Sequence, residues 1–372
     1  MSTLRSFANR LPACVGAALI AACGGGSGSG MGTGMDTGMH FVATTLVSDI
    51  ATSTSPYASA NVDPHLANGF GIAFNPRGFV WVADEATSVS TLYDGNGSTQ
   101  PLVVTIPPGS VGAARPTGIV FNATQDFQVS LAGVTGASAF VFAGQAGTLA
   151  GWSPAVNMTN AVTVVDDGAQ GAVFKGLAIA SQGTANVLYA TDFHHGVVDV
   201  FDRTFTPVVV PGAFSDAALP AGYAPFGIQA IGGLVYVTFA KQDAALADQV
   251  SGAGLGAVDV FDASGTLVKR LIAAGGALNA PWGMAMAPAN FGPFSNDLLV
   301  ANFGDGKINA FDPATGALVG TLTRPDGTPI AIDGLWGIAF GNGINAQPTQ
   351  TLFYAAGPAS QTLGVYGRID IR

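Results

Sequence analysis

Cysteine is nearly absent from this chain: the 372 residues contain only two, Cys14 and Cys23. Both lie near the N-terminus, so the rest of the chain can form no disulfide and offers no thiol nucleophile. A domain without such crosslinks depends on a large hydrophobic core, and the remaining length is sufficient to bury one.

Charged residues are also scarce, at 10% of the chain, and there are only 13 Lys and Arg against 23 Asp and Glu. The formal net charge is −10. Without Arg5 and Arg10 near the N-terminus, 11 basic residues remain against the same 23 acidic ones, a net charge of about −12. Nucleic-acid binding needs a basic surface, so the composition argues against that class of function. The acidity identifies no particular partner.

Long hydrophobic runs are missing after residue 40, and no stretch there is long enough for a transmembrane helix. Glycine is abundant instead, with 52 residues, and 48% of the chain is hydrophobic. A glycine-rich, charge-poor chain with many β-branched residues is typical of an all-β domain with many turns.

Residues 1–22 have the pattern of a bacterial lipoprotein signal peptide. Arg5 and Arg10 form a positive n-region, a short apolar h-region follows, and small residues precede Cys23. We expect Cys23 to be the lipidated first residue and residues 23–40 to form a flexible tether. An ordinary secretory signal with a coincidental cysteine is the alternative. Gly24 rather than Asp follows Cys23, which by resemblance to Gram-negative lipoprotein sorting implies the outer membrane, on its periplasmic or surface face.

A glycine that opens a short apolar strand recurs six times in residues 41–372. The six copies are Phe70-Gly71-Ile72-Ala73, Thr117-Gly118-Ile119-Val120, Lys175-Gly176-Leu177-Ala178, Phe226-Gly227-Ile228-Gln229, Trp282-Gly283-Met284-Ala285 and Trp336-Gly337-Ile338-Ala339. We call these six glycines the anchor glycines. Their spacings of 47, 58, 51, 56 and 54 residues indicate a repeat architecture.

Each repeat has the pattern of four short antiparallel strands. In the third copy we predict strands over 176–180, 187–191, 196–201 and 206–210, separated by turn residues. Several third strands end in an aromatic residue followed by aspartate, and we expect this aspartate to start a turn by bonding nearby backbone amides. The four aspartates are Asp94, Asp202, Asp262 and Asp312.

Four-stranded units with this period are typical of propeller blades, and six anchors predict an all-β, six-bladed β-propeller. The last repeat lacks a fourth strand, and residues 41–47 precede the first anchor without a blade of their own. We predict that this N-terminal strand joins the last blade and closes the ring. A seven-bladed ring and two packed sheets are the alternatives. If the number of blades is not six, the additional blade is expected at the insertion of residues 126–137 in the second repeat.

Five segments carry a family resemblance: residues 190–196, 236–243, 280–283, 302–306 and 333–337. On these segments the chain resembles NHL-type six-bladed propellers and, more closely, uncharacterised exported bacterial propellers, some of which carry a PEP-CTERM sorting tail. The resemblance implies the fold and export but no activity. The chain departs from that family by ending at Arg372 without a sorting helix, and we expect the lipid anchor at Cys23 to replace it.

Two sets of residues are expected to meet at one face of the ring, where the inner strand of each blade begins and the second strand ends. The first set comprises the residues before the anchor glycines, with one arginine nearby: Phe70, Thr117, Lys175, Phe226, Trp282, Trp336 and Arg115. The second set follows the second strands: Asp84, Glu85, Asp192, His194, His195, Lys241, Asp243, Asn302 and Asp305.

The first set lacks the oxygen ligands that a hard cation needs. This argues against the central Ca²⁺ site of gluconolactonase-like and paraoxonase-like propellers. Its four aromatic residues form either a binding rim for sugars, apolar ligands or cations, or a plug that packs between the blades. From the second set, Asn302 and Asp305 lie in a segment that either presents polar groups to a ligand or forms a tight hairpin.

Asp192, His194 and His195 lie within four residues, and Asp84 and Asn302 could reach them from other blades. Imidazole and carboxylate groups suit Zn²⁺ or another divalent transition metal. The alternative is that these side chains are solvated or bonded to one another, because adjacent residues in an extended segment point in opposite directions.

These observations favour a monomeric, lipid-anchored binding or scaffold propeller. Its charged and aromatic face would hold a small molecule, a glycan or a protein partner, and it would contact the membrane only through the anchor. A metal-dependent hydrolase or lyase, with its site at the channel mouth, is the alternative function. Propellers host both binding and catalysis, so the fold does not decide between them.

Overall fold

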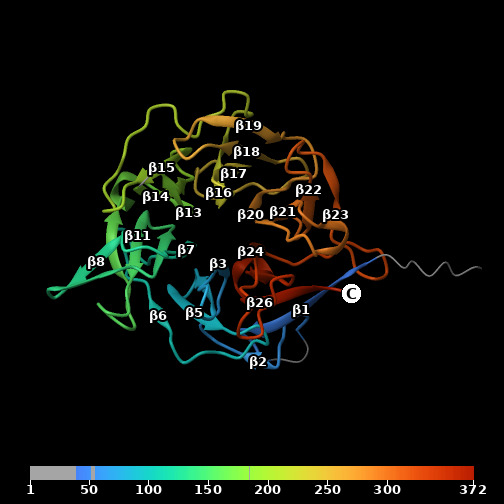
Figure 1. The fold of residues 1–372 in the computed structure, drawn as a ribbon, viewed down its shortest axis with the longest axis horizontal. Helices are drawn as coiled ribbons and strands as arrows, with labels where there is room; N and C mark the ends of the chain where they lie inside the picture. The colour runs from blue at the N-terminus through green and yellow to red at the C-terminus, as the bar shows by residue number, and fades with distance from the viewer. Residues whose placement is uncertain (1–38, 52–54, 184) are drawn as a thin grey trace, which may run out of the picture. The chain divides into compact units, whose positions relative to one another are not determined.

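The computed structural model describes residues 39–51, 55–183 and 185–372. The predicted signal peptide, Cys23 and nearly all of the predicted tether lie outside these ranges. Six sheets form a ring around a central channel, with the blades following one another in chain order (Figure 1). The prediction of a six-bladed β-propeller with four-stranded antiparallel blades is confirmed.

We number the blades in chain order, starting each from its innermost strand. Blade 1 contains β3 (Gly69–Phe74), β4 (Val80–Asp84), β5 (Val89–Tyr93) and β6 (Val104–Thr105). Blade 2 contains β7 (Pro116–Phe121), β10 (Phe140–Gly144), β11 (Thr148–Trp152) and β12 (Val162–Asp166). Blade 3 contains β13 (Phe174–Gln182), β14 (Ala185–Asp192) and β15 (Val197–Phe201).

Blades 4 to 6 follow the same order. Blade 4 contains β16 (Tyr223–Ile231), β17 (Leu234–Lys241), β18 (Gly256–Phe261) and β19 (Leu267–Ile272). Blade 5 contains β20 (Pro281–Met286), β21 (Leu298–Asn302), β22 (Ile308–Phe311) and β23 (Leu318–Thr321). Blade 6 contains β24 (Leu335–Phe340), β25 (Leu352–Ala356) and β26 (Val365–Ile371), completed by β1 (Phe41–Ser48) and β2 (Asn61–Val62).

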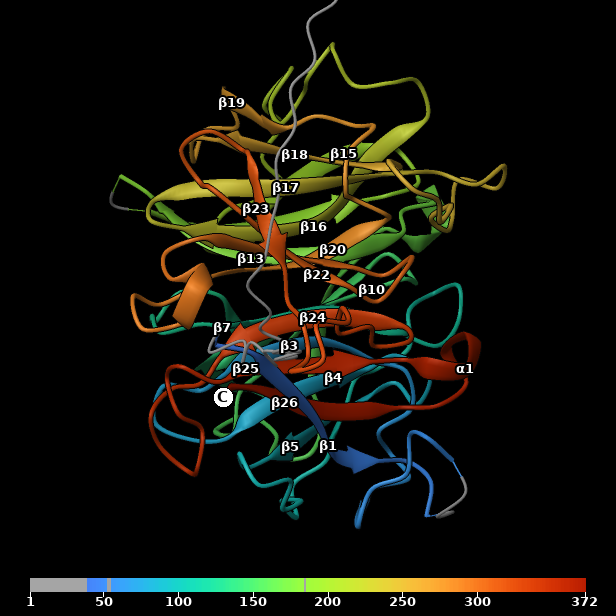
Figure 2. The same cartoon turned by 90° about the vertical axis from the view of Figure 1, so that its right-hand side faces the viewer.

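The N-terminal strand closes the ring as predicted. β1 pairs antiparallel with β26, with Phe41 opposite Ile371 and Ser48 opposite Val365. Figure 2 shows β1, in blue, crossing beside the red β26. Because the first strand completes the last blade, the first and last sheets are held together by backbone hydrogen bonds as well as by side-chain packing.

The insertion in the second repeat is a separate hairpin and not an additional blade. It consists of β8 (Gln128–Leu131) and β9 (Val134–Ala137), and β8 projects from the ring in Figure 1. The expected fourth strand over 206–210 does not form, so blade 3 has three strands. Pro207 and Pro211 flank the valines of this segment and disfavour a continuous strand, because proline has no backbone N–H to donate.

The anchor glycines lie where the inner strands of neighbouring blades approach most closely. A Cβ added to Gly176 would lie 2.9 Å from the carbonyl oxygen of Phe226, and one on Gly118 would lie 2.6 Å from the backbone nitrogen of Leu177. Such separations leave no room for a side chain. The regular spacing of glycine in the sequence therefore reflects close backbone approach at the axis.

The aromatic-aspartate pairs end their strands in turns, as predicted. Asp202 Oδ1 accepts hydrogen bonds from the amides of Thr204 and Thr206, at 2.8 and 3.0 Å. Asp94, Asp262 and Asp312 bond the amides that follow them in the same way. The core lies between adjacent blades, as where Trp81 stacks on Phe140 with ring centroids 4.2 Å apart.

In the residues that the structure describes, helical structure is limited to single turns. They are η1 (Gly168–Gln170), η2 (Gly292–Phe294) and α1 (Pro358–Gln361). Within the described ranges, no helix has the length and apolar composition needed to cross a membrane.

Candidate functional site

The two predicted sets of residues do share one face of the ring. In the strand register, the start of each inner strand lies opposite the end of the second strand: Gly69 faces Asp84, Phe174 faces Asp192 and Pro281 faces Asn302. The geometric part of the prediction is therefore confirmed. What these side chains do at that face is different from an open binding rim.

The aromatic residues of the first set pack against one another and fill this end of the channel. Phe70 stacks on Trp336 with centroids 3.7 Å apart, and Trp282 meets the edge of Phe70 at 5.0 Å. Phe70, Phe226 and Trp336 are buried. Phe303 stacks on Trp336, with ring centroids 4.1 Å apart. The rings pack against one another as a plug would; we call these five side chains the aromatic plug.

Thr117 and Lys175 occupy the two remaining positions of the inner ring. The Thr117 hydroxyl donates to the carbonyl of Phe174 at 2.9 Å. The buried Lys175 ammonium donates to Asp248 at 2.9 Å, and burial lowers the pKa of Lys175. Arg115 pairs with the carboxylate of Glu85. These three polar side chains therefore already have hydrogen-bond or ion-pair partners within the protein.

The expected metal ligands do not gather into one centre. Asp192 accepts from the amide of Val173 at 3.1 Å and approaches the ring nitrogen Nδ1 of His195 at 2.6 Å, so it clamps the loop that carries His194. Asp84 is buried in blade 1, and burial raises the pKa of its carboxyl well above the usual range. Over residues 39–51, 55–183 and 185–372, no three His, Cys, Asp or Glu side chains are placed to hold a metal ion.

Asn302 and Asp305 form the tight hairpin that was the alternative to a ligand site. The Asn302 amide donates to Asp305 at 3.1 Å and to the carbonyl of Ala277 at 2.9 Å. Lys307 completes the turn with an ion pair to Asp305 at 3.1 Å. Lys241 is exposed at the end of β17, away from these contacts.

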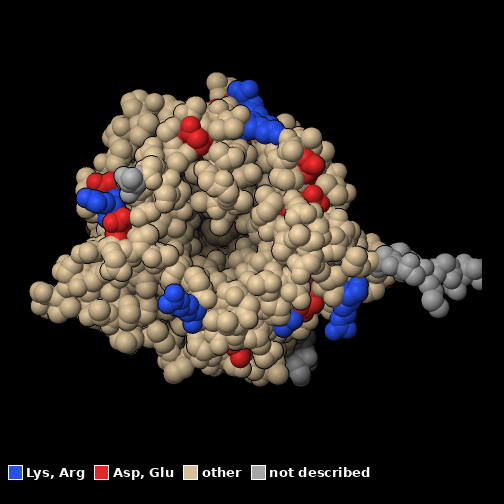
Figure 3. All heavy atoms as spheres, in the orientation of Figure 1, with Lys and Arg blue, Asp and Glu red and all other residues tan. Residues whose placement is uncertain are grey.

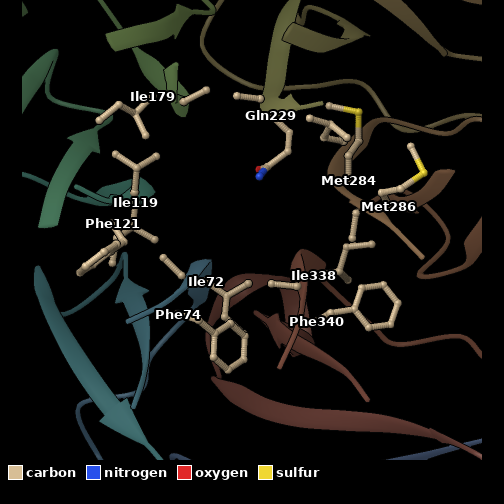
Figure 4. A pocket seen from close by; sticks show the side chains of 17 residues that line it. Ile72, Phe74, Ile119, Phe121, Ile179, Gln229, Met284, Met286, Ile338 and Phe340 are labelled. Carbon is tan, nitrogen blue, oxygen red and sulfur yellow. The ribbon is translucent and has the colours of Figure 1, made fainter. Parts of the chain in front are cut away.

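A cavity of about 440 Å³ occupies the channel beyond the plug, toward the ends of the inner strands. Figure 4 shows its lining, and the hollow at the centre of Figure 3 is bordered by uncharged residues. The side chains labelled in Figure 4 are Ile72, Phe74, Ile119, Phe121, Ile179, Gln229, Met284, Met286, Ile338 and Phe340. Apart from Gln229 these side chains are apolar, and the cavity lies on the opposite side of the plug from the face where the two predicted sets meet.

Gln229 is the exception in this apolar lining. The residue two positions after the anchor glycine is Ala73, Val120, Ala178, Ala285 or Ala339 in the other five blades. In blade 4 it is Gln229, whose side chain points into the cavity (Figure 4). It was not identified from the sequence, although aligning the six repeats on their glycines would have revealed it.

Trp282 and Gln229 are both among the residues that surround the narrow inner end of the channel, next to Gly71 and Gly337. The indole Nε1 of Trp282 is buried, and within the described part of the chain it has no hydrogen-bond partner. A buried donor without a partner is unusual and indicates a place where a ligand acceptor or a water molecule would be stabilised.

Comparison with known proteins places the chain among viral relatives. No protein-family model matches it. It is 34% identical over 303 residues to "Uncharacterized protein R648" of Acanthamoeba polyphaga mimivirus, covering 80% of this chain and 74% of that protein. "Uncharacterized protein L690" of the same virus is 33% identical over 305 residues, covering 80% of this chain and 79% of that protein.

Among solved structures, a protein of unknown function from Bacteroides thetaiotaomicron has a TM-score of 0.55 at 11% identity. The match covers 89% of this chain and 76% of that one, and at this identity it concerns the fold alone. The two viral relatives do not bear on the expected link to exported bacterial propellers. The identity and coverage of the viral matches place the chain, a six-bladed β-propeller, in the same protein family as the mimivirus proteins R648 and L690.

Proposed function

We propose that this protein is a ligand-binding propeller that takes a slender apolar molecule into its central channel. The observation that carries the proposal is a cavity of about 440 Å³ whose lining side chains are apolar except for the carboxamide of Gln229, which projects into it. Ligand pockets are commonly apolar with a few polar groups that fix orientation.

The lining favours a ligand with an apolar body and one hydrogen-bonding group. Burial of apolar surface provides about 25 cal/mol per Å². The carboxamide of Gln229 can donate and accept hydrogen bonds, and in the part of the chain that the structure describes its side chain bonds no other residue. Gln229 and the indole of Trp282 would then orient the polar group of the ligand near the closed end.

Two matched fluorescent probes test this proposal. N-phenyl-1-naphthylamine carries an N–H donor, and 1-benzylnaphthalene has a methylene group in its place. We expect the wild-type protein to bind the amine more tightly by about fivefold, the equivalent of one hydrogen bond of about 1 kcal/mol. Gln229→Ala, which restores the residue of the neighbouring repeats, removes this preference and leaves the binding of the hydrocarbon.

A channel-blocking variant controls for binding elsewhere. Ala339→Phe adds a ring to the cavity wall and is expected to abolish binding of both probes, whereas Gln125→Ala, an exposed glutamine outside the channel, leaves it unchanged. Unaltered binding of both probes in Ala339→Phe would refute the channel as the site.

Lipid anchoring is a further part of the proposal. The lipobox-like sequence before Cys23 supports export from a Gram-negative bacterium and attachment to the outer membrane. Labelled palmitate is expected to enter the wild-type protein but not Cys23→Ala. Equal labelling of the two would exclude this anchor.

A further inference from the structure

Blade 3 lacks the outer strand that the other five blades have. The residues equivalent to Val198 in the third strands of those blades all pair with an outer strand. They are Ser90 opposite Val104, Leu149 opposite Val165, Val258 opposite Ile272, Tyr366 opposite Val47, and Ile308, whose carbonyl accepts from Leu322 at 3.0 Å. Val198 is opposite Thr191 on its inner side and, within the described ranges, has no strand on its outer side.

The chain leaves this edge soon after β15 ends. Val208 donates from its backbone to the carbonyl of Val200 at 2.8 Å, and Phe201 forms an isolated bridge with Pro207. Because backbone groups alternate along a strand, Val200 and Val198 face the same side. The backbone N–H and C=O of Val198 therefore point toward the place that an outer strand occupies in the other blades.

A groove of about 280 Å³ lies along this edge. Its walls come from β15 and from the segment 207–210, and valines dominate them. On β15 the side chain of Val197 is 45% exposed and that of Val198 is buried, and on the segment 207–210 Val209 is 87% exposed. In Figure 1 β15 lies at the outer rim of the ring. An edge strand with unpaired backbone groups and exposed β-branched side chains is a template for pairing with another chain.

The groove is acidic at one end. Asp167 and Asp199 line it, and it has no basic lining residue among those described. Burial, together with the nearby carboxylates of Asp192 and Asp167, raises the pKa of Asp199 to about 6. A basic side chain placed here would relieve the repulsion between these carboxylates.

We propose that the outer edge of β15 binds one extended peptide segment of a partner protein, which adds the missing fourth strand to blade 3. The segment carries β-branched apolar residues at alternate positions and a Lys or Arg opposite Asp199. A second copy of this chain fits less well. Antiparallel pairing of two such edges would bring the carboxylates of Asp199 and Asp167 toward those of the other copy, and like charges across strands are destabilising.

The probe is a fluorescein-labelled synthetic peptide with the sequence Ser-Lys-Val-Thr-Val-Thr-Val-Ser, measured by fluorescence polarisation. Hydrogen exchange is measured on the same complex. We expect saturable binding and slower exchange confined to the β15 segment. Val198→Pro removes the N–H of the edge and is expected to weaken binding at least tenfold, whereas Val319→Pro on the exposed strand β23 leaves it unchanged.

A second experiment reverses the charges on the peptide and on the protein, and it tests the proposal even if Val198→Pro does not fold. In a second peptide Glu replaces Lys. Wild-type protein is expected to prefer the Lys peptide about tenfold, and Asp199→Lys to prefer the Glu peptide. Binding without slower exchange in β15, or an unchanged preference in Asp199→Lys, would overturn the proposal. A dimer in light scattering that Val198→Pro dissociates would also overturn it, because it would assign this edge to a second copy.

Discussion

Gly337 of blade 6 lies directly against the carbonyl oxygen of Phe70 in blade 1, and a Cβ added to the glycine would lie 2.8 Å from that oxygen. The contact joins the last inner strand to the first, at the point where the ring closes. The same relation between an anchor glycine and the next inner strand recurs around the axis. It makes the diameter of the ring depend on the absence of six side chains.

Gly337→Ala is therefore expected to destabilise the protein by about 1 to 3 kcal/mol, since the new methyl group forces one inner strand away from its neighbour. Urea unfolding followed by tryptophan fluorescence measures this. Gly276→Ala is the matched control, because nothing lies within 4 Å of a Cβ at that position. Equal stability of the two variants would show that the inner strands can separate without cost.

Trp336→Ala is expected to lower the free energy of unfolding by about 3 to 5 kcal/mol. The indole is buried, stacks on Phe70 and Phe303, and donates to Asn68 at 3.1 Å, so its removal leaves a large cavity in the aromatic plug. Trp336→Phe retains a ring and should lose less. A smaller loss for alanine than for phenylalanine would contradict the packing role.

The buried carboxyl of Asp259 in blade 4 is expected to make the stability of the protein depend on pH. Burial, followed by the neighbouring Asp216 carboxylate, raises the pKa of Asp259 to about 7, although Arg270 opposes the shift. The pKa of Asp259 is higher in the folded state than in the unfolded state. The contribution of its protonated carboxyl to stability is therefore complete below about pH 4 and is lost as the pH rises through 7. Asp259→Asn is expected to be more stable than wild type by about 1 to 2 kcal/mol at pH 8, and this advantage should vanish at pH 4. Thermal unfolding at the two pH values measures the difference.

His195 is expected to titrate above its ordinary pKa of 6.5, because its ring is hydrogen-bonded to Asp192 at 2.6 Å. Its stabilising contribution is complete below the unfolded pKa and is lost as the pH rises through the folded pKa. NMR titration of the imidazole measures the value, and Asp192→Asn should lower it. No change in that variant would show that Asp192 does not set the titration of His195.

Much of the fold was predictable because it depends on local patterns. The aspartates after strand-ending aromatic residues bond amides two to four residues away, so the turn at Asp202 could be inferred from its immediate neighbours. The pairing of β1 with β26 also followed from counting strands. The fourth strand of blade 3 was mispredicted because the valines at 208–210 have high β-propensity, whereas Pro207 and Pro211 oppose pairing.

The candidate site was predicted less well, because its parts belong to different blades. Asp192 and His195 are near in sequence and do meet, but they bond each other and no metal cluster forms among the described residues. In the sequence Gln229 is one polar residue within a predicted strand. Its position in the cavity is recognisable only once the inner strands of the other five blades surround the same space with apolar side chains.

By itself the sequence determined the number of blades and the closure of the ring, since close approach at the axis admits only glycine and therefore leaves a regular spacing in the chain. Only the tertiary structure decided where the channel is closed and where it is hollow. Phe70 and Trp336 are 266 positions apart by their numbers and stack at 3.7 Å, and packing between residues so distant depends on side-chain volumes brought together by the whole ring.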